Sequence, residues 1–151
     1  MKSSNLALAA SNVLLGTAVG AGLNQSVFVM PGWFSSPPES LTSAQSNRTF
    51  RKFWIPLQAA CALALGAAFA LNRRGRRRGA LAGALGLYLG TWVSTAAYFA
   101  PEIVRLGKPD SGIPAADISR RGKRWLGLTW LRHLALGAAW ALNASALARR
   151  A

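Results

Sequence analysis

An arginine and a histidine stand next to each other in one apolar stretch of this sequence, as Arg132 and His133 of LTWLRHLAL, residues 128–136. A histidine can exchange a proton near neutral pH, and an arginine can stabilise a developing negative charge. His133 is the only histidine in the chain and Cys61 the only cysteine. With so few nitrogen and sulfur ligands, we predict no metal or haem site within one chain, and no other cofactor.

Four apolar runs must position these two side chains, and they set the expected architecture. The runs cover residues 6–30, 54–71, 80–100 and 125–148. A helix needs about 20 apolar residues to cross the hydrocarbon core of a bilayer, and Arg132 is the only Arg, Lys, Asp or Glu inside these runs. We therefore predict one all-α domain over residues 1–151, an up-down-up-down four-helix transmembrane bundle with the lipid bilayer as its partner.

The start of the first run has an alternative interpretation as a cleaved signal peptide. Lys2 precedes the run, and small residues occur at positions 18–22, as they do near signal cleavage sites. We favour a retained first span, because the apolar run is long for a signal core and continues to Met30.

The basic residues favour a membrane surface over nucleic acid as their partner. The chain has 18 Lys+Arg against 4 Asp+Glu, a net charge of +14. Most of the basic residues flank the apolar runs, where lipid headgroups lie. No zinc-finger spacing and no RNA-reading aromatic motif is present, so we predict no nucleic-acid partner.

The placement of charge also predicts the orientation in the membrane. With an even number of spans, both termini share one side with the loop NRRGRRRG, residues 72–79, which contains five arginines. The acids lie on the opposite side, at Glu39, Glu102, Asp110 and Asp117. Positively charged loops stay in the cytoplasm. We therefore predict a multi-pass protein of the bacterial cytoplasmic (inner) membrane with both termini cytoplasmic.

Small residues predict where the helices pack, because close backbone approach favours association in lipid. The first run offers Gly16 and Gly20, with Asn12 and Asn24 extending that face. The third run offers a longer stripe, Gly79, Gly83, Gly86, Gly90 and Ser94. We predict that both faces pack against neighbouring helices, and the sequence leaves association with a second copy of the chain open.

Polar side chains converge at one depth if the spans alternate in direction. The third run carries a hydroxyl stripe of Tyr88, Thr91, Thr95 and Tyr98, and the fourth carries a stripe of Trp125, Thr129, Arg132, Leu136, Trp140 and Asn143. His133 lies about 100° around the helix from Arg132. In the non-cytoplasmic half we expect a polar cluster of Asn24, Gln25, Gln58, Thr95, Tyr98, Arg132 and His133, with Glu102 as a counter-ion for Arg132. The alternative is that Arg132 reaches the interface and the other residues only join helices.

The order of four short motifs resembles the anthrone oxygenase-like family of four-helix membrane proteins, a family long described as a domain of unknown function. The motifs are FVMPG (28–32), NRTFRKFWIPL (47–57), YLGTWVSTAAYFAP (88–101) and WLGLTWLRHLAL (125–136). Together they span nearly the whole chain. Two features differ from the family pattern: Phe99 and Ile103 flank Pro101 where the family often has asparagines, and Thr129 occupies a position that is often asparagine.

The resemblance implies an oxidoreductase, a cofactor-independent oxygenase that oxidises an anthrone-like aromatic at its methylene carbon. In such a reaction His133 would be the candidate base and Arg132 the group that stabilises the enolate, and the resemblance supports Arg132 more than His133. The substrate would lie among Asn24, Gln25, Gln58, Thr95, Tyr98, Trp125, Thr129 and Trp130. The alternative is a non-catalytic membrane subunit, assembly factor or small-ligand-binding protein. A transporter is less favoured, because no carboxylate lies within a span.

Overall fold

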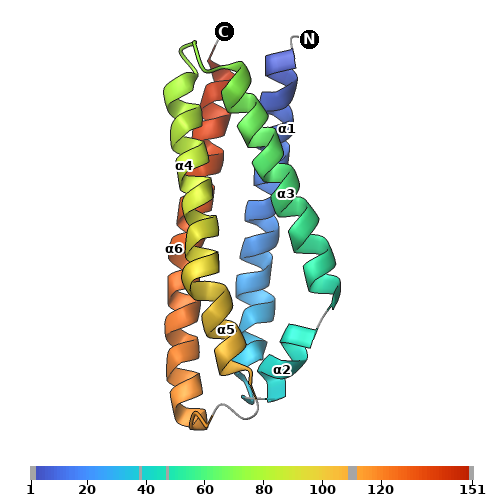
Figure 1. Cartoon of the computed structure of the whole chain (residues 1–151), viewed down its shortest axis with the longest axis vertical. Helices are drawn as coiled ribbons and strands as arrows, with labels where there is room; N and C mark the ends of the chain where they lie inside the picture. Colours follow the sequence, from blue (N-terminus) through green and yellow to red (C-terminus); the bar gives the residue numbers. More distant parts are fainter. Residues whose placement is uncertain (1–2, 38, 47, 109–111, 150–151) are drawn as a thin grey trace.

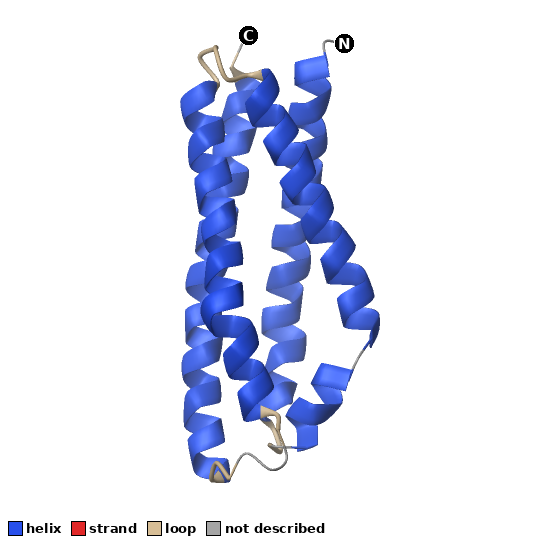
Figure 2. Ribbon diagram, in the orientation of Figure 1, coloured by secondary structure: helices blue, strands red, loops and turns tan. Residues whose placement is uncertain are grey.

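The computed structural model describes residues 3–37, 39–46, 48–108 and 112–149. Within these residues every regular element is a helix (Figure 2), which confirms the predicted all-α fold. The long helices are α1 (Ser3–Asn24), α3 (Arg48–Leu71), α4 (Arg78–Ser94) and α6 (Ala115–Ala148). They alternate in direction, so that the start of α1, the end of α6 and the connection between α3 and α4 lie at one end of the molecule (Figure 1).

Shorter helices lie at the opposite end, where they extend or connect the long ones. They are η1 (Gln25–Val29) and η2 (Met30–Phe34) after α1, α2 (Glu39–Ser46) before α3, and η3 (Thr95–Phe99) and α5 (Ala100–Leu106) after α4. Two of them, η1 and η3, are π-helices. A π-turn is wider than an α-turn and is often found at functional sites.

A proline accounts for each π-turn, at the same spacing in both helices. Pro31 and Pro101 each lie two residues beyond the end of a π-helix. A proline ring clashes with the carbonyl four residues earlier, and these carbonyls belong to Val27 and Ala97 within η1 and η3. The wider turn relieves the clash, so each chain segment stays helical beyond its π-turn, in η2 and in α5.

Three helical segments of the described chain are long and apolar enough to cross a membrane, namely Ser3–Phe34, Arg51–Leu71 and Arg78–Leu106. They contain the whole of the first three predicted spans, residues 6–30, 54–71 and 80–100. Helix α6 is the longest helix, with 34 residues, but it is not among these segments. Its first part is charged, and Arg132, His133 and Asn143 make its apolar part more polar. The fourth span over residues 125–148 therefore stays a prediction.

The core runs along the bundle axis and is made of leucine, alanine, one tyrosine and the buried Cys61. Leu8 and Leu15 of α1, Leu65 of α3 and Tyr88 of α4 are fully buried in one cluster, to which α6 contributes Leu136. A second cluster near the short helices joins Met30, Phe99 and Trp125. The first half of α3 diverges from the other long helices (Figure 1), so this second cluster is built by α6 and by the segments that follow α1 and α4.

The prediction that two glycine-containing faces pack against neighbouring helices is only partly correct. A Cβ atom on Gly16 would lie 3.3 Å from Trp140 Nε1, and one on Gly83 would lie 3.1 Å from Leu142 Cδ1, so both glycines do face a neighbouring helix. In contrast, a Cβ would meet nothing within 4 Å among the described residues at Gly20, Gly79, Gly86 and Gly90. The helices instead bury alanine and leucine positions such as Ala18, which gain more contact area than glycine.

Candidate functional site

Arg132 lies on the face of α6 that packs against η3. Its Nη1 atom donates a hydrogen bond to Thr95 Oγ1 at 3.2 Å, and its guanidinium carbon lies 4.5 Å from the centre of the Phe99 ring. A cation over an aromatic face is attracted by the ring quadrupole. Neither contact neutralises the charge, and no ion pair joins Arg132 to an acid within the part of the chain that the structure describes.

A groove of about 320 Å³ lies beside Arg132, where α4 and η3 meet α6. It is lined by Gly90, Thr91, Ser94, Tyr98, Phe99, Leu128, Leu131, Arg132 and Ala135. Its volume is at the lower end of the range for small-molecule sites. The surface of the lining is almost wholly apolar, and its polar groups are the Arg132 guanidinium and three hydroxyl groups. Two of these hydroxyl groups donate to carbonyls of α4, Thr91 Oγ1 to Tyr88 O and Ser94 Oγ to Thr91 O.

His133 points to a different neighbour, the segment that follows α1. Its Nε2 atom lies 2.6 Å from Ser26 Oγ in η1, and its ring makes an edge-to-face contact with Trp130 with the ring centres 5.9 Å apart. Gly22 provides the space for this ring, because a Cβ there would lie only 2.8 Å from His133 Cε1. His133 does not line the groove beside Arg132.

Arg132 and His133, although adjacent in the sequence, therefore lie at two different interfaces of α6. Arg132 contacts η3 and His133 contacts η1, and each π-turn supplies one hydroxyl group, from Thr95 and from Ser26. Successive helical residues point about 100° apart, which accounts for this division. A single small substrate in the groove would contact the Arg132 guanidinium without contacting the His133 ring.

Two predicted residues of the fourth run support the site from inside the core. Trp125 is buried, and its Nε1 atom donates a hydrogen bond to Phe99 O at 3.0 Å. Thr129 is fully buried, and its hydroxyl donates to Trp125 O at 2.9 Å. The Trp125 bond joins α6 to η3, whereas the Thr129 bond lies within α6. Trp130, on the opposite flank, is 44% exposed and contacts His133 rather than the groove.

The remaining predicted residues do not join Arg132 and His133 in one cluster. Tyr88 Oη lies 2.7 Å from both Gln58 Oε1 and Gln58 O, which share its one proton. This contact forms a separate link between α3 and α4. Asn24 is exposed. Gln25 is buried, and its Nε2 atom has no hydrogen-bond partner among the described residues.

The predicted role of Glu102 as the counter-ion of Arg132 is wrong. Glu102 instead forms a two-point ion pair with Arg121, with Arg121 Nε at 2.7 Å from Oε1 and Nη2 at 2.8 Å from Oε2. Glu102 lies in α5, beyond η3, while Arg121 lies about three turns before Arg132 on α6. The antiparallel course of the two helices therefore brings Glu102 level with Arg121.

Three residues at the site were not identified from the sequence. They are Ser26, Gly22 and Phe99, which contact His133 or Arg132. The four-residue spacing of Gly22 and Ser26 indicates that they share a helix face, a signal that could have suggested a close contact. The described residues contain no group of three or more His, Cys, Asp and Glu side chains that could hold a metal ion.

Comparison of the chain with protein-family models, with curated proteins and with solved structures gives no match.

Proposed function

We propose that this chain is a four-span integral membrane protein that binds a small hydrophobic anion in the groove beside Arg132. Suitable ligands are aromatic molecules with a phenolate, enolate or carboxylate group. The groove places the guanidinium next to Tyr98 and Phe99, so an aromatic ligand could pack on the rings while its anionic oxygen meets the cation.

The observation that carries this proposal is the Arg132 charge without an acidic partner. A charged arginine within a membrane span costs about 2.5–3.5 kcal/mol on insertion scales. The Thr95 hydroxyl and the Phe99 ring reduce this cost without neutralising the charge. A bound anion would supply the missing opposite charge. The Tyr98 hydroxyl could donate to another of its polar atoms, whereas the Thr91 and Ser94 hydroxyls already donate to carbonyls of α4.

A second candidate is a cofactor-independent oxygenase acting on an anthrone-like aromatic, which the resemblance to the anthrone oxygenase-like family supports. Removal of a proton from the methylene carbon gives an enolate that reacts with oxygen, and the products are a quinone and water. Arg132 would stabilise the enolate. Binding without catalysis is the better supported of the two, because the only histidine of the chain contacts Ser26 rather than the groove.

Anion binding is tested with anthracene-9-carboxylate, using anthracene-9-carboxamide as the neutral molecule of similar shape. The protein is placed in phosphatidylcholine nanodiscs, and Kd is measured from quenching of tryptophan fluorescence. We expect wild type to bind the carboxylate at least ~10-fold more tightly than the amide, and Arg132→Gln to remove this preference. The control Arg124→Gln changes an exposed arginine of the same helix and should leave the preference intact.

A carboxylate preference that survives Arg132→Gln, or that never appears in wild type, would overturn the binding proposal. Oxygenase activity is tested separately by oxygen uptake with anthrone. Turnover that is lost in Arg132→Ala and in His133→Ala would support the roles implied by the resemblance. Turnover that persists in both variants would refute those roles, and carboxylate binding without any turnover would leave a non-catalytic binding protein.

A further inference from the structure

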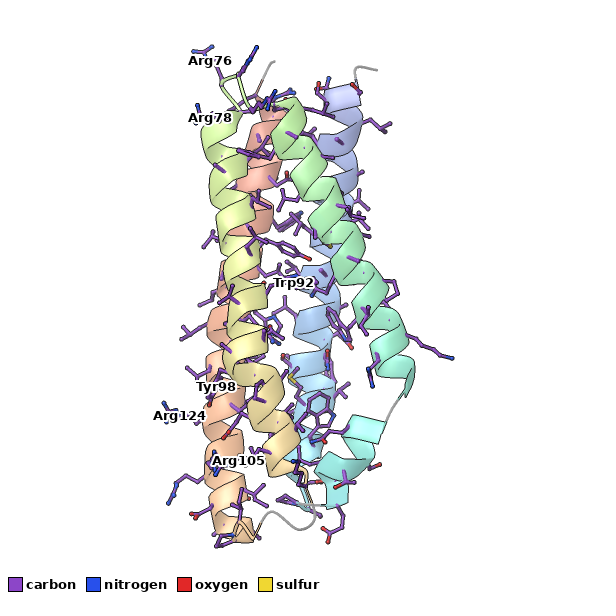
Figure 3. All side chains as sticks on the ribbon, in the orientation of Figure 1. Arg76, Arg78, Trp92, Tyr98, Arg105 and Arg124 are labelled. Atoms are coloured by element: carbon purple, nitrogen blue, oxygen red, sulfur yellow. The ribbon has the colours of Figure 1, made fainter. Side chains whose placement is uncertain are left out.

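The connection between α3 and α4 gathers exposed arginines at the end of the bundle opposite the Arg132 site. Arg76 and Arg78 are labelled at this end in Figure 3, far from Arg105 and Arg124 at the other end. Exposed arginines at this end of the bundle are Arg73, Arg74, Arg76, Arg78 and Arg149. We refer to these five residues as the arginine rim.

A buried arginine fixes the shape of this connection. Arg77 is 5% exposed, and its Nε and Nη2 atoms donate to Arg149 O at 2.9 and 2.6 Å. Its Nη1 atom donates to Asn5 Oδ1 at 2.7 Å. Arg149 Nη1 in turn donates to Arg76 O at 3.3 Å. These hydrogen bonds join the connection to the start of α1 and to the end of α6, and they fix the backbone that carries the rim arginines.

Acidic residues of the described chain lie at the other end of the bundle. Glu39, Glu102 and Asp117 belong to α2, α5 and the start of α6, which Figure 1 shows away from the rim. Two of them pair locally, Glu102 with Arg121 and Asp117 with Arg120. Positive charge at that end is therefore partly compensated, whereas the described acids compensate none of the charge at the rim.

We propose that the arginine rim binds the phosphate groups of anionic phospholipids. The rim lies where three candidate membrane spans begin or end, at the level of the lipid headgroups. Arginine binds phosphate through two parallel hydrogen bonds, and basic residues near a membrane surface attract acidic lipids. This proposal rests on the membrane insertion proposed above, but it does not depend on ligand binding at Arg132 and involves none of the residues that line the groove.

The experiment compares two triple variants that remove the same formal charge from opposite ends. One is Arg74→Gln, Arg76→Gln and Arg78→Gln in the rim. The matched control is Arg105→Gln, Lys123→Gln and Arg124→Gln, whose side chains are likewise exposed. Phosphatidylglycerol and phosphatidylcholine are titrated separately into each detergent-solubilised protein, and Kd is obtained from the lipid adducts in native mass spectra.

We expect wild type to prefer phosphatidylglycerol, the rim variant to lose at least ~10-fold of this preference, and the control to lose much less. An equal loss in both variants, or an unchanged rim variant, would overturn the proposal. Binding of a single-stranded oligonucleotide is measured for the same proteins. If the rim variant loses this binding but keeps the phosphatidylglycerol affinity of wild type, the proposal is overturned and nucleic acid is the partner of the rim. If the triple variant unfolds by circular dichroism, Arg73→Gln with Arg74→Gln must give a smaller loss in the same direction.

Discussion

His133 Nε2 and Ser26 Oγ lie 2.6 Å apart across the interface between α6 and η1. The Ser26 hydroxyl also lies 3.4 Å from Met30 Sδ, to which it can donate. If it does so, the His133 nitrogen carries the proton and donates to the Ser26 oxygen, and the opposite tautomer reverses the direction. The only histidine of the chain thus serves as a polar link between two helical segments, in a place where Gly22 allows its ring to enter.

Substitution of Gly22 by alanine should displace His133 and destabilise the bundle. The new Cβ would lie 2.8 Å from His133 Cε1, and such overpacking costs about 1–3 kcal/mol. Gly20→Ala is the matched control, because a Cβ there meets nothing within 4 Å among the described residues and alanine favours a helix. Thermal unfolding in detergent should show a lower Tm for Gly22→Ala only. Equal Tm values for the two variants would contradict the described contact.

Removal of the Tyr88 hydroxyl should weaken the link between α3 and α4. Tyr88→Phe deletes the hydrogen bonds to Gln58 and leaves Gln58 Oε1 without its donor. Hydrogen bonds between membrane helices contribute on average about 0.6 kcal/mol, and at most about 1.7 kcal/mol. A double-mutant cycle with Gln58→Leu measures the coupling, with Tyr98→Phe as the control for loss of a phenol group. A coupling energy near zero would show that the two side chains act independently.

Replacement of Arg77 by lysine should destabilise the end of the bundle although the charge is kept. A lysine ammonium cannot reproduce the planar set of donors that Arg77 directs to Arg149 O and Asn5 Oδ1. Hydrogen bonds to charged groups contribute about 1.5–3 kcal/mol, so a loss of roughly 2 kcal/mol is expected. Arg78→Lys, at the exposed neighbour, should unfold like wild type. Chemical unfolding in nanodiscs measures both, and wild-type stability in Arg77→Lys would exclude this role.

Substitution by methionine should destabilise the protein at Arg121 but not at Arg132. Arg132→Met removes a charge without an acidic partner among the described residues, and stability should stay the same or rise by up to about 2 kcal/mol. Arg121→Met leaves Glu102, whose side chain is 13% exposed, without its partner, and stability should fall. Tm values in the same detergent test both. A fall in Arg132→Met as large as that in Arg121→Met would show that the Arg132 contacts are mainly structural.

The sequence determined the composition of the helices and the position of the polar residues along them. Long apolar runs require helices, because backbone groups in lipid must be satisfied within the segment. This reasoning anticipated the three candidate spans and the all-α fold. It also placed Thr95 at the same depth as Arg132, because the predicted spans alternate in direction, and it put Trp125 and Thr129 on one stripe of the fourth run.

Only the tertiary structure decided which helix each polar side chain contacts. In a soluble helix a polar face marks the exposed side, but in a helix that crosses a membrane the residues facing lipid and the residues facing the core are equally apolar. The pattern of apolar residues therefore does not show which face of each helix points to the core. For this reason the sequence did not anticipate that Gln58 contacts Tyr88, that Glu102 pairs with Arg121, or that Arg132 and His133 face different π-turns. Packing fixes rotation and axial position together, and these determine the hydrogen-bond partners of the site.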